Sequence, residues 1–375
     1  MREMTHRFTR RTLLLSAISA GLIRSVRPAG ADDAATPTAP AGPVWKTLPP
    51  LPEARSEFAA AVIDRRIYVA GGFGAESRVD RYDPVSEKWT QLADLPVAIH
   101  HPGVAALDDL FYVAGGYTID NQRAVDFLWV YDPARNSWTE RASLPVARGA
   151  FGLVPFAGAL YAVGGAREQL GGPVSGSVDR YDPSTDAWHP AASMRTPREH
   201  LAVVVAADRI FAIGGRANGD EDDRFAAANE AYDPVTDVWE TRTPLPVPRG
   251  GLTGAPIAGR VIVMGGERGT NLYADVNGYD PASNTWAPLP RLPIARHGLA
   301  SAALDDQLYA IGGSTLAQRV QNTPVVECLD LPANSERSDA SANHPLDHSP
   351  PSFRGNRGIS PFVTAVIRDS SNSSE

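Results

Sequence analysis

Apolar residues in this chain occur in short runs separated by polar turns, and six of these runs end at a pair of glycines. Residues 102–144 show the pattern clearly. It predicts strands over residues 102–107, 110–114 and 127–131 and a fourth within residues 137–144, with a tight turn at Asp108 and Asp109. The chain also has 33 Gly and 32 Pro residues, more turn formers than a helical protein of this size uses. We therefore expect an all-β protein built from many short strands.

The same unit recurs along the chain. Six glycine pairs close an apolar run, and they begin at Gly71, Gly115, Gly164, Gly214, Gly265 and Gly312. Five Tyr-Asp-Pro segments begin at Tyr82, Tyr131, Tyr181, Tyr232 and Tyr279, and a tryptophan follows each tyrosine by seven residues. From Trp45 and from each of these five tryptophans, the next glycine pair begins 26 residues later, whereas the spacing from glycine pair to tyrosine varies between 11 and 18 residues. All length variation is therefore confined to one connection per repeat.

This order of motifs resembles the kelch repeat: paired glycines, then Tyr-Asp-Pro, then tryptophan. The resemblance covers residues 44–332. It implies a six-bladed kelch-type β-propeller. The strand pattern agrees with this fold, because four strands in about 48 residues make one propeller blade.

The sixth repeat departs from the pattern. Leu329 stands at its tyrosine position, and Glu336 stands where a tryptophan is due. At the other end of the chain, Trp45 lies in an unmatched apolar segment, residues 44–48. We predict that this N-terminal strand completes the last blade and covers what would otherwise be an open sheet edge.

The segments outside the repeats have their own signals. Arg10 and Arg11 precede an apolar run at residues 12–23, which is too short to cross a membrane, and small residues follow at 29–31. Residues 1–31 resemble a twin-arginine signal peptide, which predicts a periplasmic or secreted protein without stable membrane insertion after cleavage. We expect a flexible leader over residues 32–43 and a disordered tail over 333–375; an interaction arm is the alternative for the tail.

Charge and cysteine content exclude two classes of function. The net charge of −8 argues against a nucleic-acid partner, which would need a basic surface. The single Cys328 excludes an internal disulfide and a cysteine-built metal site. We expect a monomer whose ligand is a protein or a carbohydrate.

The first candidate binding residues lie ten positions after each tryptophan. Five of these six positions are arginines, namely Arg55, Arg148, Arg198, Arg249 and Arg296, and the sixth is Ile99. In a propeller they share a face with the variable connections, so we expect a ring of arginines that holds an anionic ligand. The alternative is that these arginines cap carbonyl groups between blades.

The next two positions of each repeat carry a second set of candidates. They include Glu57, His100, His101, Glu199, His200 and His297. Tyr117, Arg216 and Glu267 follow glycine pairs and should line the same mouth. Histidine and glutamate near the axis could form a proton-transfer pair or a metal site; the alternative is that the histidines bond backbone groups at blade junctions. Our prediction is that the protein holds no metal and no cofactor.

These patterns predict an exported kelch propeller that binds a protein or a glycan through the face bearing the variable loops. The alternative is an enzyme, because kelch propellers include a sialic acid mutarotase. The resemblance would then imply a mutarotase or epimerase acting on an acidic sugar, with Arg216 or the arginine ring holding its carboxylate. The candidate catalytic residues of such an enzyme are Glu57, Glu199, His200 and Glu267.

Overall fold

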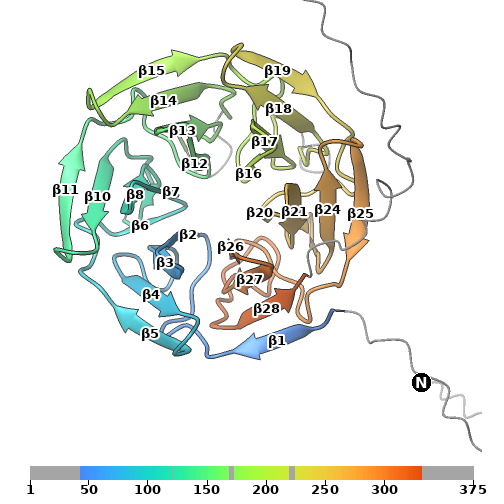
Figure 1. Ribbon diagram of the computed structural model, residues 1–375, viewed down its shortest axis with the longest axis horizontal. Coiled ribbons are helices and arrows are strands. Elements are labelled where there is room, and N and C mark those ends of the chain that lie inside the picture. Colours follow the sequence, from blue (N-terminus) through green and yellow to red (C-terminus); the bar gives the residue numbers. More distant parts are fainter. Residues whose placement is uncertain (1–42, 121, 169–172, 219–223, 332–375) are drawn as a thin grey trace, which may run out of the picture. The chain divides into compact units, whose positions relative to one another are not determined.

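The computed structural model describes residues 43–120, 122–168, 173–218 and 224–331. These residues form six four-stranded antiparallel sheets arranged around a central axis as the blades of a propeller (Figure 1). The described residues contain no helix. The prediction of an all-β, six-bladed propeller is therefore confirmed.

Each blade runs from an inner strand at the axis to an outer strand at the rim (Figure 1). The first three blades are β2 (Ala59–Ile63), β3 (Arg66–Ala70), β4 (Val79–Asp83) and β5 (Lys88–Gln91); β7 (Gly103–Leu107), β8 (Leu110–Ala114), β10 (Leu128–Asp132) and β11 (Ser137–Arg141); and β12 (Gly152–Phe156), β13 (Ala159–Val163), β14 (Val178–Asp182) and β15 (Ala187–Ala191). The last three are β16 (Ala202–Ala206), β17 (Arg209–Ile213), β18 (Asn229–Asp233) and β19 (Val238–Thr241); β20 (Thr253–Ile257), β21 (Arg260–Met264), β24 (Val276–Asp280) and β25 (Thr285–Leu289); and β26 (Ala300–Leu304), β27 (Gln307–Ile311), β28 (Val326–Asp330) and β1 (Trp45–Leu48). Two short pairs complete the set, β6 (Ile99–His100) with β9 (Tyr117–Thr118) and β22 (Glu267–Arg268) with β23 (Asn271–Leu272).

The predicted strands of the second blade agree closely with the observed ones. Asp108 and Asp109 form the turn between β7 and β8 with φ angles of 51° and 60°, as a two-residue hairpin of type I′ requires. The fourth strand ends at Arg141, within the predicted segment of residues 137–144. There the buried Leu144 leaves the ladder, and its N–H donates to the carbonyl of Asp126 at 2.6 Å.

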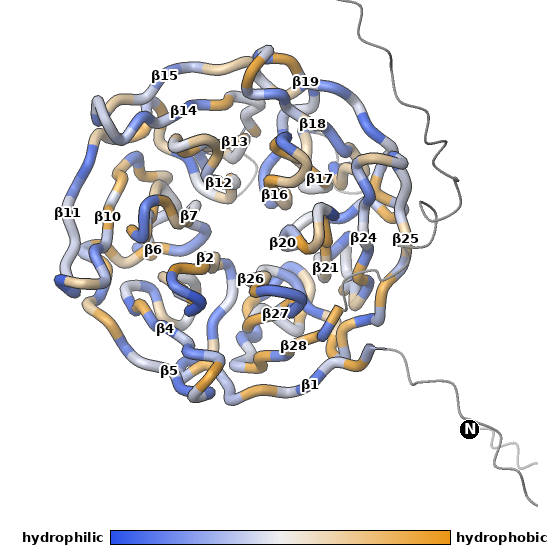
Figure 2. Tube along the Cα trace, viewed as in Figure 1, coloured by the Kyte–Doolittle hydropathy of each residue, from blue (hydrophilic) through white to orange (hydrophobic). Residues whose placement is uncertain are grey.

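The hydrophobic core lies between the blades. Each of its six clusters contains inner-strand and second-strand side chains from two neighbouring blades, together with the tyrosine of the Tyr-Asp-Pro segment or its replacement. The outer strands contribute little to this core, and Figure 2 shows β5 and β11 mostly in hydrophilic colours. The repeat tryptophans are the exception, because they pack on the edge of the clusters.

Each repeat tryptophan also joins its blade to the link that precedes it. The indole N–H donates to a backbone carbonyl at 2.7–3.1 Å in all six blades: Trp45 to Pro290, Trp89 to Pro49, Trp138 to Ala93, Trp188 to Ala142, Trp239 to Ala192 and Trp286 to Thr243. The tryptophan therefore contributes apolar surface and a directional bond at the same place.

The N-terminal strand closes the ring of blades as predicted. Strand β1 pairs antiparallel with β28, so that Trp45 lies opposite Leu329 and Lys46 lies opposite Cys328 (Figure 1). The bond from Trp45 to Pro290 repeats the contact that the other tryptophans make. The last blade is thus completed by residues from the other end of the repeat region, and its edge is covered.

A ring of backbone hydrogen bonds surrounds the axis. One residue just before each inner strand has a left-handed φ between 52° and 63°, and its N–H donates to the carbonyl of the corresponding residue in the preceding blade at 2.7–3.0 Å. In chain order these residues are Glu57, His101, Ala150, His200, Gly251 and Gly298. We call this feature the axial ring. It lies at the end of the blades where the glycine pairs and variable loops occur, which we call the loop end.

The glycine pairs form further backbone hydrogen bonds between neighbouring blades at the loop end. The N–H of each second glycine donates at 2.9–3.0 Å to the carbonyl of the residue ten positions after the next tryptophan, for example from Gly72 to Ile99. Gly72 has a φ of 94°, and a Cβ there would lie 2.6 Å from the carbonyl oxygen of Ser56. Only glycine fits this approach.

The predicted signal peptide, the C-terminal tail and nearly all of the leader lie outside the described residues. Among those that are described, none belongs to a helix of the length and apolar character needed to span a bilayer.

Closure by β1 leads to a stability prediction. Trp45→Ala should lower the free energy of unfolding by about 2 kcal/mol, because it removes a half-buried indole and its bond to Pro290. Val44→Ala is the control: Val44 is 68% exposed, and its replacement should change stability by less than about 0.5 kcal/mol. Denaturant or thermal unfolding measures both. Equal stability of the two variants would contradict this role of the N-terminal strand.

A candidate site at the propeller axis

Polar side chains from several blades meet at the axial ring. Glu57, His101 and His200 belong to the ring itself. Residues next to it form short bridges to the residues that follow the glycine pairs, such as Glu199 with Arg216 and His297 with Ser314. The group that we call the axial cluster consists of Glu57, His101, Glu199, His200, Arg216, Glu267 and His297. The repeat thus brings together residues that are far apart in sequence.

The Glu57 carboxylate lies among three imidazoles. Its Oε2 is 3.1 Å from Nε2 of His101 and 3.9 Å from Nε2 of His200, and its Oε1 is 3.5 Å from Nε2 of His297. The two Nε2 atoms of His101 and His200 are 2.9 Å apart. These side chains are only 4–11% exposed. Protein groups therefore replace most of the water around them.

Two further carboxylates and one guanidinium surround this centre. Glu199 accepts a hydrogen bond from Nδ1 of His200 and lies 3.7 Å from the guanidinium of Arg216. Glu267, which is fully buried, pairs with Arg216 and accepts a 2.7 Å hydrogen bond from the backbone N–H of Gln318. Nδ1 of His297 is 3.7 Å from Glu267. Arg216 therefore already has two carboxylate partners.

Aromatic side chains complete one side of the cluster. His100 is fully buried, its Nδ1 lies 2.5 Å from Nδ1 of His101, and its ring stacks on Phe73 with centroids 4.0 Å apart. Tyr117 packs against both imidazoles and donates its hydroxyl to the carbonyl of Ala166 at 3.1 Å. Tyr117 thus contacts the cluster with its ring, while its hydroxyl is used to hold the neighbouring blade.

Burial and neighbouring charges set the protonation of these groups. Burial tends to raise the pKa of Glu57, but the imidazoles of His101, His200 and His297 outweigh it and hold that pKa well below 4.5. The pKa of Glu199 is also lowered, because His200 and Arg216 outweigh its burial. Burial and the positive charge of Arg216 lower the pKa of His200. Burial, with His101 adding to it, lowers the pKa of His100 to about 3. Glu57 and Glu199 are therefore held in their ionised form.

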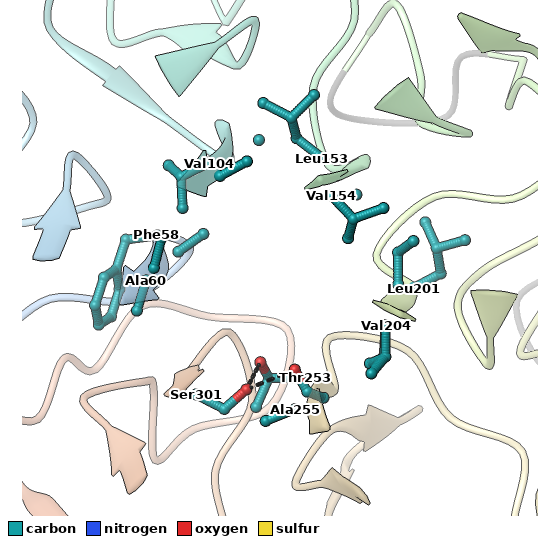
Figure 3. A pocket seen from close by; sticks show the side chains of 18 of the residues that line it. Phe58, Ala60, Val104, Leu153, Val154, Leu201, Val204, Thr253, Ala255 and Ser301 are labelled. Carbon is teal, nitrogen blue, oxygen red and sulfur yellow. Dashed lines mark hydrogen bonds between the residues drawn. The ribbon is translucent and has the colours of Figure 1, made fainter. Parts of the chain in front are cut away.

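A cavity of about 400 Å³ extends from the axial ring along the inner strands (Figure 3). Glu57, His101 and His200 lie at one end of it. Most of the residues that line it have apolar side chains or none, and the hydroxyls of Thr253 and Ser301, which share a 2.7 Å hydrogen bond, add polar groups. The lining is more exposed toward the hairpin turns. This cavity thus reaches the cluster along the inner strands, whereas the sequence suggested a mouth at the loop end.

The five predicted ligand-binding arginines are placed elsewhere. Each is at most 1% exposed and bonds a side chain on the third strand of its own blade. The pairs are Arg55 with Asp80, Arg148 with Asp179, Arg198 with Glu230, Arg249 with Asn277, and Arg296 with Glu327. None of these arginines lines the cavity. The structure therefore corrects the expected ring of guanidinium groups around an anion. The arginines have a structural role, but they bond side chains and carbonyl groups within their own blade, whereas the alternative interpretation placed their carbonyl contacts between blades.

The second blade supports a structural role for these pairs. It has Ile99 in place of the arginine and Trp129 in place of the acidic partner, and both belong to one hydrophobic cluster. The partner is the residue two positions before the tyrosine of each repeat. The sequence shows this acidic or amide partner at a constant position in each repeat that has the arginine, but the prediction of the arginine ring did not use it. The contact between Gln318 and Glu267, in contrast, has no sequence signal.

One subset of the cluster has the donor atoms of a metal site. Glu57, His101 and His200 each offer one ligand atom, and these atoms all lie within 4.8 Å of one another. Other predicted site residues lie outside this three-residue subset. Arg216 and Glu267 pair with each other within the axial cluster, and His100 contacts His101. Seven of the predicted site residues thus meet in the axial cluster, with His100 and Tyr117 packed against it.

The buried arginines provide a second prediction. Arg296→Leu should lower the free energy of unfolding by about 3–5 kcal/mol, because it leaves Glu327 buried without its charge partner. The double variant Arg296→Leu/Glu327→Leu should be more stable than this single variant, since the second blade already has apolar residues at both positions. Chemical denaturation of the three proteins gives the comparison. A double variant that is no more stable than the single one would show that the pair does more than neutralise buried charge.

Comparison with known proteins identifies the family to which this architecture belongs. Residues 103–313 match the family model described as the KLHDC2/KLHL20/DRC7 Kelch-repeats domain, and residues 54–96 match the Kelch motif. No curated protein sequence matches the chain. A solved structure described as "Structure of YjhT" is similar with a TM-score of 0.64 and 19% sequence identity, covering 75% of this chain and 96% of that chain. At this identity the likeness concerns the fold alone. The chain belongs to the kelch-repeat family and folds as a six-bladed kelch β-propeller.

Proposed function

We propose that this propeller is an exported binding protein for a small carbohydrate, which it holds in the cavity against the axial cluster. The observation that carries the proposal is the burial of the cluster's ionisable side chains at the end of that cavity. Burying such groups costs free energy, so a concentration of them in a cavity is typical of a functional site rather than of a scaffold. The predicted signal at residues 1–31 supports export.

The dimensions of the cavity favour a small ligand over a folded partner. About 400 Å³ is in the range of small-molecule pockets. Its apolar wall suits the C–H faces of a sugar ring, while the Thr253 and Ser301 hydroxyls and the cluster offer hydrogen bonds. A protein partner would instead use the loop end, where Ile119, Leu316 and Val320 are exposed.

Sugar anomerisation is the second candidate, and the contacts between glutamates and histidines favour it. This reaction needs one group to accept a proton and another to donate one while the ring opens. Glu199 bonded to His200, and Glu57 beside His101, are pairs of the required kind. The charges favour a neutral sugar over an acidic one, because Arg216 is already paired with Glu199 and Glu267.

Binding can be tested by calorimetric titration of the full chain with neutral and acidic monosaccharides. We expect saturable binding of one sugar class, with Ala60→Phe weakening it more than tenfold because the larger side chain occupies the cavity. Val85→Phe is the control, since Val85 is 92% exposed and lies outside the cavity. Absence of binding by every sugar, or equal binding by the Ala60→Phe variant and the wild-type protein, would reject the cavity as the carbohydrate site.

Catalysis can be tested separately by NMR. The protein should accelerate equilibration of a freshly dissolved α-anomer of the sugar it binds, and Glu199→Gln should reduce the catalysed rate by about 10²–10⁴-fold through loss of proton transfer. A sugar that binds without faster equilibration would leave the protein a binding module and reject the enzyme candidate.

A further inference from the structure

Three ligand-type atoms in the axial cluster surround a point at metal-binding distance from all of them. The three separations among Glu57 Oε2, His101 Nε2 and His200 Nε2 are 3.1, 2.9 and 3.9 Å. A triangle with these sides has a circumradius of about 2.0 Å, which is the length of a zinc–nitrogen or zinc–oxygen bond. One ion could therefore contact all three atoms without displacement of the backbone.

The second contacts of these ligands match those of metal sites. A histidine that binds a metal usually donates its other ring N–H to a carboxylate or another acceptor. Here Nδ1 of His200 bonds Glu199, and Nδ1 of His101 lies 2.5 Å from Nδ1 of His100. With its proton on Nδ1, His200 presents the lone pair of Nε2 to the centre. Oε1 of Glu57, the oxygen not counted as a ligand, faces His297.

The charge of the cluster also calls for a cation. Three carboxylates, Glu57, Glu199 and Glu267, face one guanidinium, that of Arg216, among the described residues of the cluster. The carboxylates of the cluster thus outnumber its guanidinium by two, and a divalent ion would supply two positive charges. Buried charge that is not balanced in this way is costly.

The axial ring fixes the three ligands in position. Glu57, His101 and His200 have φ values of 55°, 57° and 52°, and each is held by backbone bonds to both neighbouring blades. The other ring positions carry only Ala150, Gly251 and Gly298. A Cβ on Gly298 would lie 2.5 Å from Oε1 of Glu57. Small residues at these positions therefore leave room for the carboxylate.

We propose that Glu57, His101 and His200 bind one divalent first-row transition-metal ion at the inner end of the cavity. Two imidazoles and one carboxylate are the ligand set of many zinc sites and of non-haem iron(II) sites, where the remaining positions stay open. All three residues line the cavity. This inference does not depend on the carbohydrate proposal, because metal binding is measured without sugar.

The test is a metal titration of the full chain after removal of bound ions with EDTA. Zn²⁺, Co²⁺ and, without oxygen, Fe²⁺ are the probes, followed by calorimetry and by the visible absorption of cobalt. We expect one tight equivalent per chain for at least one of them. Glu57→Gln and His101→Ala should weaken it by more than about 100-fold, and Glu199→Gln, which removes an outer contact, by about 10–100-fold.

The matched control is His189→Ala, because His189 is an exposed histidine of outer strand β15 and should leave the affinity unchanged. Circular dichroism checks that each variant folds. If an alanine variant does not fold, the isosteric Glu57→Gln variant still tests the proposal. The metal should also raise the thermal unfolding temperature of the wild-type protein and not that of Glu57→Gln. Absence of one-equivalent binding for all three ions, its survival in His101→Ala/His200→Ala, or its loss in His189→Ala would overturn the proposal.

Discussion

The structure depends on a closed set of backbone hydrogen bonds around the propeller axis. Six residues in left-handed conformation, one per repeat, each donate an N–H to the preceding blade and accept from the next. The set closes only if all six blades are present, and the sixth is complete only when β1 pairs with β28. Local backbone geometry and the N-terminal strand are therefore linked, because both are needed for the same circular arrangement.

Buried charge is used in this propeller in two ways. In the blades, an arginine and an acid or amide from the same sheet form an isolated pair, which the second blade replaces with Ile99 and Trp129. At the axis, several carboxylates and imidazoles share one site with a single guanidinium. The first arrangement is completed within one repeat. The second brings ionisable groups from several blades into one site, and this distinguishes a site able to bind a ligand from a structural pair.

The axial ring also explains why the site can differ from blade to blade while the fold does not. Its hydrogen bonds use only backbone atoms, so the side chains at these positions are free to vary as long as the left-handed conformation is accessible. Glycine and alanine occupy three of the positions, and Glu57, His101 and His200 occupy the others. The fold thus supplies a rigid frame, and three repeats supply the functional groups.

The sequence by itself determined the number of blades, the strand order and the closure by Trp45, because glycine pairs, Tyr-Asp-Pro and tryptophan recur at spacings that resemble the kelch repeat. It also identified the histidines and glutamates that meet at the axis. It could not separate them from the arginines one or two positions earlier, since both sets share one periodicity. Only the tertiary structure decided this: the arginine side chains lie within the blades, opposite acids of the third strand, while the next residues turn through a left-handed φ toward the axis. The direction of a side chain depends on that backbone angle and on contacts between distant repeats, neither of which residue spacing records.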